Sequence, residues 1–119
     1  VYNASVTRSA WTKELNRLLT IYDVLVLPCA QVFAFDANMD WPKKIAGQTM
    51  DTYHRWMEVV IGPTLAGLPV LALPAGMENG VPFGIQLIGK PQGEFALLQM
   101  GYAWEQSTPF AQMQSTLLK

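Results

Sequence analysis

The chain has 119 residues and a formal net charge of -1, and only 14% of its residues are charged. This length suits one domain or one part of a larger domain. Lysine and arginine are scattered and form no basic stripe, so no nucleic-acid partner is expected. No apolar run approaches the roughly 20 residues that span a bilayer, so no membrane partner is expected. A charge content below the usual value of about 25% leaves two interpretations open: an ordinary compact α/β domain, or a chain partly covered by other polypeptide.

The N-terminus suggests that the sequence begins inside a longer polypeptide. Val1 is not an initiator Met, and neither a basic region nor an apolar signal segment follows it. Cys29 is the single cysteine, which excludes an internal disulfide. A reducing cytoplasm is therefore the default compartment. No cofactor is expected.

The first half of the chain predicts a helix, a strand and a long connection. Apolar side chains recur at helical spacing over residues 8–19. They are Trp11, Leu15, Leu18 and Leu19. Residues 23–28 form a continuous apolar run ended by proline, as expected of a strand buried on both faces. Residues 28–49 then form a connection too long for a simple turn, and such connections are often functional.

The second half predicts two further helices around a pair of strands. Residues 50–61 have a helical apolar pattern. Gly62 and Pro63 should interrupt it before a short helical turn that ends at Gly67. Two strands follow, at residues 68–74 and 82–89.

The turn between these strands and the last helix have clear local signals. Asn79-Gly80 is typical of a tight hairpin turn. Residues 93–107 are expected to form the final helix, with Pro109 shortly beyond its end. Within the strands, Pro69 and Pro74 should lie at the two ends of the first, where a missing N–H costs least.

The fold class is therefore α/β, with a mixed sheet and flanking helices. Each of the three predicted strands is expected to be buried on both faces, yet a three-stranded sheet leaves exposed edges. The sheet should be one edge of a larger sheet, or two copies should pair. Gly84 should permit a close approach to its strand, and Gln86 should find backbone partners because it lies within an apolar strand.

Three patterns in this order resemble the C-terminal part of the amidase signature family. They occupy residues 22–28, 66–76 and 82–89, and the resemblance extends over about residues 8–110. It implies that residues 1–119 are the C-terminal segment of an amidase-like domain, which is thus incomplete. Many members have Asn where this chain has Thr64, which leaves the subfamily open.

The resemblance implies an enzyme that hydrolyses carboxamide carbon–nitrogen bonds with a Ser–cis-Ser–Lys triad. A matching Gly/Ser-rich stretch is not found in this sequence. The serines, none of them in a Gly-Ser cluster, are Ser5, Ser9, Ser107 and Ser115. The lysines Lys43, Lys44 and Lys90 lie in loop-like contexts. This chain alone is therefore expected to be inactive, and no catalytic residue is assigned to it.

The expected partners are the remainder of the amidase chain or a second copy, with a small amide as the substrate of the complete enzyme. Two alternatives stay open: a non-catalytic binding or assembly module, and part of an amidotransferase subunit. In the family, the loop after the first strand approaches the active-site side of the sheet. The residues that this resemblance assigns to substrate binding are Pro28, Cys29, Gln31 and Phe33.

The aromatic side chains of the connection, Phe33, Phe35 and Trp41, allow two interpretations. They anchor the connection to the core, or one or two of them line a pocket. The stripe formed by Tyr53, Trp56, Tyr102 and Trp104 is interpreted as core.

Three polar or reactive side chains could suggest other chemistry. Cys29 could pair with His54 as a nucleophile and base, but an inert buried thiol is the preferred interpretation. His54 and Glu58 could begin a metal site, but no further ligand completes it. These two are interpreted as a surface pair.

Overall fold

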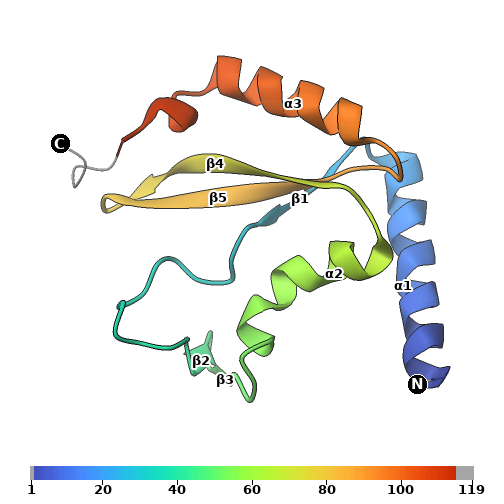
Figure 1. Cartoon of the computed structure of the whole chain (residues 1–119), viewed down its shortest axis with the longest axis horizontal. Helices are drawn as coiled ribbons and strands as arrows, with labels where there is room; N and C mark the ends of the chain where they lie inside the picture. Colours follow the sequence, from blue (N-terminus) through green and yellow to red (C-terminus); the bar gives the residue numbers. More distant parts are fainter. Residues whose placement is uncertain (1, 115–119) are drawn as a thin grey trace.

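The computed structural model describes residues 2–114, so Val1 and residues 115–119, Ser115 among them, lie outside the described part of the chain. Helices and strands follow one another in the order that the sequence predicts, with one extra hairpin and two short 3-10 turns (Figure 1). The elements are α1 (Tyr2–Ile21), β1 (Leu25–Pro28), β2 (Lys44–Ile45), β3 (Gln48–Thr49), η1 (Arg55–Met57), α2 (Glu58–Ala66), β4 (Val70–Glu78), β5 (Val81–Ile88), α3 (Glu94–Ser107) and η2 (Phe110–Gln112).

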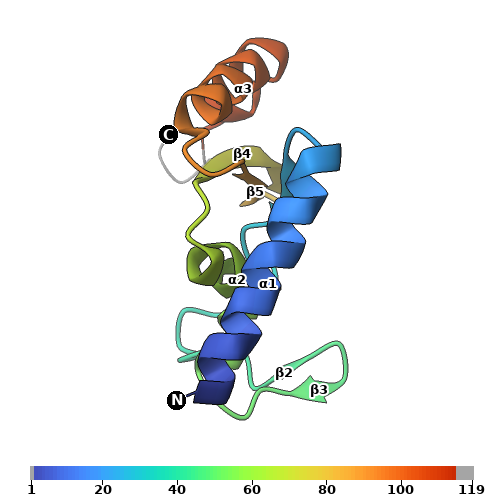
Figure 2. The same cartoon turned by 90° about the vertical axis from the view of Figure 1, so that its right-hand side faces the viewer.

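The main sheet has the strand order β1-β5-β4 and lies between helices. Figure 1 shows α3 along one side of the β4–β5 ribbon and α2 on the other side. Figure 2 agrees and shows α1 next to α2. The predicted α/β class is confirmed, and the pairings of β5 with β1 and with β4 are both antiparallel.

Strand β5 separates two hydrophobic clusters because its side chains alternate between the faces of the sheet. Leu87 belongs to the cluster under α3, together with Leu73 and Leu97. Ile88, which is 1% exposed, belongs to the second cluster. The other buried members of that second cluster are Leu15, Leu19 and Leu68.

Burial of the strands differs from the sequence prediction. Val26 and Leu27 of β1 are 52% and 38% exposed, and Val70 of β4 is 41% exposed. The prediction that every strand is buried on both faces is therefore wrong: β1 and β4 are partly exposed, and in β5 only residues 86–88 are buried. The physical reason is that a face of the sheet is covered only where a helix or loop packs on it.

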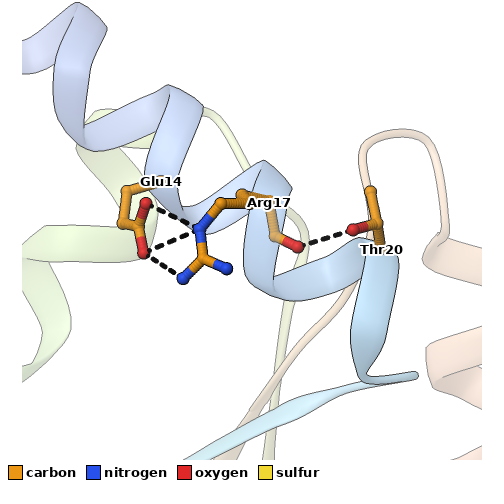
Figure 3. A network of polar contacts seen from close by, with 3 residues as sticks. All are labelled: Glu14, Arg17 and Thr20. Atoms are coloured by element: carbon orange, nitrogen blue, oxygen red, sulfur yellow. Dashed lines mark hydrogen bonds and ion pairs between the residues drawn. The ribbon is translucent and has the colours of Figure 1, made fainter.

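Helix α1 is longer than its apolar pattern predicts. The periodicity detects only the part that packs, whereas the helix begins at Tyr2, which is 80% exposed. Its surface carries a salt bridge in which Arg17 Nη2 lies 2.6 Å from Glu14 Oε1 (Figure 3). The Arg17 hydrogen bond lowers the pKa of the Glu14 carboxyl. Within residues 2–114, no helix is both long and apolar enough to cross a membrane.

The predicted break at Gly62-Pro63 is wrong. Helix α2 begins only at Glu58 and continues through Pro63 to Ala66. Proline has no N–H, so the carbonyl of Val59, four residues earlier, loses its helical partner. The Gln86 side chain replaces it, because its Nε2 donates to Val59 O at 3.1 Å. A distant strand thus satisfies the carbonyl that the proline leaves unpaired.

The end of α2 confirms the predicted role of Gly67. This residue adopts the left-handed conformation, with φ 68° and ψ 31°. Leu68 N–H donates to Pro63 O at 3.2 Å, and Gly67 N–H donates to Thr64 O at 3.1 Å. This pair of bonds is a Schellman motif, which ends the helix and turns the chain toward β4.

The β4–β5 hairpin confirms the predicted tight turn. Asn79 and Gly80 have φ values of 51° and 77°, as a type I′ turn requires. Pro74, however, does not end its strand. The register shifts between Pro74 and Gly76, so Ala75 is an extra residue in β4. A bulge tolerates a proline because the ladder is already interrupted there, and the strand continues to Glu78.

Candidate functional site

A hollow of about 490 Å³ lies where the end of β1, the loop after it and the start of β5 meet. Residues 28–35 form most of its lining, and Trp56 and the stretch 82–84 complete it. None of these lining residues is charged. The structure brings all four predicted binding residues together in this hollow: Pro28, Cys29, Gln31 and Phe33.

Aromatic rings meet edge to face around the hollow. The rings of Phe33 and Phe83 have centroids 5.6 Å apart and are perpendicular. Phe35 and Trp56 make the same kind of contact, also at 5.6 Å. Such pairs add about 0.5–1.5 kcal/mol beyond their burial. Phe33 and Phe35 therefore anchor the loop and line the hollow at once.

Trp41 fits only the interpretation in which the aromatic side chains anchor the long connection, and not the one in which they line a pocket. It is not among the lining residues of the hollow. Its ring meets Tyr53 at a centroid distance of 6.3 Å, and Lys43 Nζ lies 3.4 Å from its centroid. Trp41 thus ties the middle of the long connection to the segment that precedes α2.

Two glutamines tie the wall of the hollow to α2 through the backbone N–H and the backbone carbonyl of one residue, Val59. Gln31 Oε1 accepts the Val59 N–H at 3.0 Å, which pairs a donor in the first turn of α2. Gln86 is 3% exposed, and its Nε2 donates to Pro28 O at 2.9 Å as well as to Val59 O. The prediction of backbone partners for Gln86 is confirmed. The sequence contains no sign that Gln31 reaches the same residue.

Gly84 allows β5 to approach the neighbouring backbone closely, as predicted. A Cβ at this position would lie 2.8 Å from Leu73 O and 3.3 Å from Cys29 Sγ. The Cys29 N–H donates to Gly84 O at 3.0 Å, which continues the β1–β5 pairing into the loop. Any side chain at position 84 would thus move the wall of the hollow.

Cys29 is not set up as a nucleophile. Burial raises the pKa of its thiol, and a hydrogen bond with the Leu73 backbone opposes this only in part. A neutral thiol is a poor nucleophile at neutral pH. In the described part of the chain no hydrogen bond joins Cys29 to His54. The imidazole is exposed and meets the ring of Tyr53 at 6.0 Å.

The predicted surface pair of His54 and Glu58 is only partly present. Both residues are exposed, but the Glu58 carboxylate lies 3.4 Å from Arg55 Nη1 and forms its salt bridge there. Residues 2–114 contain no group of three His, Cys, Asp or Glu side chains placed to hold a metal ion.

Trp56 is one of the lining residues whose role the sequence interpretation missed, as it also missed residues 82–84. Its aromatic spacing suggested a core position, yet it lies at the hollow and its indole Nε1 is buried without an acceptor in residues 2–114. Trp11 and Trp104, in contrast, donate to Gly62 O at 2.8 Å and to Pro74 O at 2.9 Å. The only sequence signal for this difference is that a buried tryptophan needs an acceptor.

The comparisons with known proteins agree with the resemblance. The Amidase family profile matches residues 1–98. The chain therefore belongs to the amidase signature family. Among its relatives is a glutamyl-tRNA(Gln) amidotransferase subunit from Thermodesulfovibrio yellowstonii, which is 34% identical over 96% of this chain. The corresponding amidotransferase subunit from Desulforudis audaxviator is 42% identical over 85% of the chain.

Solved structures confirm the fold. A bacterial aryl acylamidase of the amidase signature enzymes superposes with a TM-score of 0.78 at 24% identity, over 90% of this chain and 22% of that one. A glutamyl-tRNA(Gln) amidotransferase subunit from Thermotoga maritima gives a TM-score of 0.59 at 30% identity, over 79% of this chain and 20% of that one. The chain spans 22% and 19% of the two sequence relatives, about a fifth of their length.

Proposed function

We propose that residues 1–119 are the C-terminal segment of an amidase that hydrolyses a carboxamide carbon–nitrogen bond. The hollow would form one side of its substrate pocket. The Ser–cis-Ser–Lys residues implied by the family would come from polypeptide outside this segment. The exposed outer strands support this proposal, because Val26 of β1 and Val70 of β4 are half-exposed apolar residues that further strands or helices would cover.

The uncharged lining of the hollow carries the proposal on the substrate. Phe33, Phe35 and Phe83 give it an aromatic wall, and no lining residue is charged. Small-molecule pockets are mostly apolar with a few placed polar groups, and about 300–1,000 Å³ in volume. An apolar wall favours an uncharged group, such as an aryl or alkyl substituent of the amide. We therefore expect a small apolar or aromatic carboxamide.

Hydrolysis of benzamide by the complete polypeptide that carries these residues tests the proposal. The 119 residues alone should give no turnover, whereas the polypeptide with its upstream sequence should hydrolyse the amide. Phe33→Ala should raise KM for benzamide by about tenfold, since one edge of the aromatic wall is lost. Phe95→Ala is the matched control, because Phe95 is 73% exposed on α3 and does not line the hollow. Equal kinetics for both variants would refute the placement of the pocket.

A second candidate is part of an amidotransferase subunit. The sequence relatives described above favour it, because both are glutamyl-tRNA(Gln) amidotransferase subunits. Glutamine is a substrate with an α-ammonium and an α-carboxylate, which need charged or strongly polar partners when they are buried. The lining of the hollow contains no charged side chain. Comparing turnover of L-glutamine and benzamide decides between the candidates, and copurification of a partner chain would favour the amidotransferase.

A further inference from the structure

Phe83 connects the hollow to the α3 side of the sheet. Its side chain follows the alternation of β5, so it lies on the same face as Leu87, which packs under α3. Gly76 of β4 is its partner in the antiparallel register. The Phe83 ring also belongs to the lining of the hollow and meets Phe33 edge to face at 5.6 Å. Any contact that holds this ring in place therefore also shapes the aromatic wall of the hollow.

Two aromatic rings occupy the space that a side chain at Gly76 would fill. A Cβ built at this glycine would lie 3.0 Å from Phe83 Cζ and 3.7 Å from Phe110 Cε1. Gly76 also has a φ of 151°, a conformation that residues with a side chain rarely adopt. In a sheet, an aromatic ring packed across from a glycine shields the bare backbone. Phe83 and Phe110 thus cover the same glycine, one from β5 and the other from η2.

Phe110 is itself held by the end of α3. Its ring meets that of Trp104 at a centroid distance of 6.1 Å. The Trp104 indole N–H donates to Pro74 O at 2.9 Å, and Pro74 lies at the bulge directly before Gly76. Figure 1 shows η2, in red after α3, on the same side of the β4–β5 ribbon as α3. The end of α3, η2 and the bulged part of β4 therefore form one set of contacts beside the Phe83 ring.

We propose that Phe110 is a positioning residue for the substrate pocket, because it keeps the Phe83 ring against Phe33 and so maintains the wall that an aryl amide contacts. Without the Phe110 ring, space opens beside Gly76, and the Phe83 ring can turn into it and away from Phe33. Phe110 lies beyond residues 1–98, which the Amidase profile matches, and it is not among the lining residues of the hollow. The inference rests on the proposed function, and it adds a residue that shapes the hollow without lining it.

Kinetics of the complete polypeptide test the inference, with benzamide and acetamide as substrates. Phe110→Ala should raise KM for benzamide about threefold and leave kcat nearly unchanged, because a displaced wall weakens ground-state and transition-state binding alike. Acetamide has no ring to pack on the wall, so its KM should stay the same. Phe110→Leu refills most of the space and should restore most of the KM for benzamide. Phe95→Ala is the matched control, since Phe95 is exposed on α3, and it should change neither substrate.

A double-mutant cycle separates positioning of Phe83 from a general loss of order. If Phe110 acts through Phe83, Phe110→Ala should have no further effect on KM in a protein that already carries Phe83→Ala. The same increase in both backgrounds would mean that Phe110 acts by another route, which overturns the inference. Equal increases in KM for benzamide and acetamide would overturn it as well, because the effect would not depend on an aromatic group.

Phe33→Ala distinguishes failure of this inference from failure of the proposed function. When Phe33→Ala raises KM for benzamide and Phe110→Ala does not, the pocket stands and the positioning role is refuted. When neither variant raises KM, or when the complete polypeptide does not hydrolyse benzamide, both are refuted.

Discussion

The two sides of the central strand β5 are built on different principles. On the α3 side, Leu87 packs with Leu73 and Leu97, and the space between helix and sheet is filled by apolar side chains. On the loop side, the polar Gln86 occupies the same strand and reaches two carbonyls with one amide. One side is a packed core, and the other combines the hydrophobic cluster around Ile88 with a polar clamp beside a hollow.

This contrast shows how one side of a sheet can contain a hollow and still keep its side chains in defined positions. Close-packed cores stay rigid because neighbouring atoms leave no room. The loop side leaves a hollow of about 490 Å³, so its order must come from directional contacts. The bonds of Gln31 and Gln86 to the backbone N–H and carbonyl of Val59 supply these contacts, together with the edge-to-face aromatic pairs. The following predictions test whether the two sides differ in this way.

Leu97→Ala should give the largest effect, because it removes a side chain that is 3% exposed from the packed side. Leucine-to-alanine changes in cores lower the free energy of unfolding by about 2–5 kcal/mol. Urea denaturation followed by circular dichroism measures the change. Leu98→Ala is the control on the same helix, since Leu98 is 59% exposed, and it should cost at most about 0.5 kcal/mol. Equal losses for the two variants would contradict a packed core beneath α3.

Gln86→Leu should be the largest single change on the loop side. Leucine fills a similar volume, yet it leaves Pro28 O and Val59 O without the donor they share. A buried group left unpaired costs about 1–3 kcal/mol, so the free energy of unfolding should fall by about 2 kcal/mol. Gln99→Leu, on the exposed surface of α3, is the matched control for the change in polarity. If Gln86→Leu is as stable as that control, the polar clamp has no energetic role.

Amide hydrogen exchange can locate the effect of Gln86→Leu. Loss of the clamp should speed exchange in the first turns of α2 and leave the α3 amides protected. The same comparison for Leu97→Ala should give the reverse pattern. Uniform loss of protection in both variants would mean that the two sides unfold as one unit.

The packed side was largely predictable from the sequence, and the loop side was not. Helical and strand patterns locate α3 and the β4–β5 hairpin because periodic apolar burial is what forms them. The Asn79-Gly80 turn and the Gly67 cap follow from backbone conformations that few residues adopt. The continuation of α2 through Pro63 could not be foreseen, since it depends on an amide from residue 86.

The hollow was only partly predictable, again because some of its contacts join residues that are distant in the sequence. The resemblance placed the four residues Pro28, Cys29, Gln31 and Phe33 together, and they do line one hollow. It did not reveal that Gln31 is bonded to the first turn of α2, nor that Trp56 joins the lining. Both depend on how the long connection folds back, and the β2–β3 hairpin within that connection has only a weak sequence signal. Its turn residues, Ala46 and Gly47, both have positive φ.

Gly67→Ala should give a smaller effect, limited to backbone strain where α2 turns toward the sheet. No atom lies within 4 Å of a Cβ built at this glycine, so there is no clash. The left-handed conformation costs a residue with a side chain about 1–2 kcal/mol, and the free energy of unfolding should fall by about 1 kcal/mol. Gly67→Asn should recover most of the loss, because asparagine tolerates this conformation. A larger loss in Gly67→Asn than in Gly67→Ala would contradict a purely conformational role.

The smallest expected effect concerns how far water reaches the thiol of Cys29, which lines the hollow. Burial raises the pKa of its thiol, so the thiolate should form at higher pH than in the unfolded chain. Alkylation by iodoacetamide should accordingly show a pH midpoint above that of the same protein in urea, where the thiol is solvated. Because Cys29 is the only cysteine, the alkylation signal has one source.

The raised pKa of Cys29 also gives the stability of the fold a pH dependence of definite sign. Above the ordinary thiol pKa the unfolded chain loses its proton first, so stability should fall slightly as pH rises toward the raised folded value. Cys29→Ser should remove this alkaline decrease, which urea denaturation at several pH values measures. Identical alkylation midpoints for the folded and the urea-unfolded protein would mean that water reaches the thiol freely, and the loop side would then be open rather than a sheltered pocket wall.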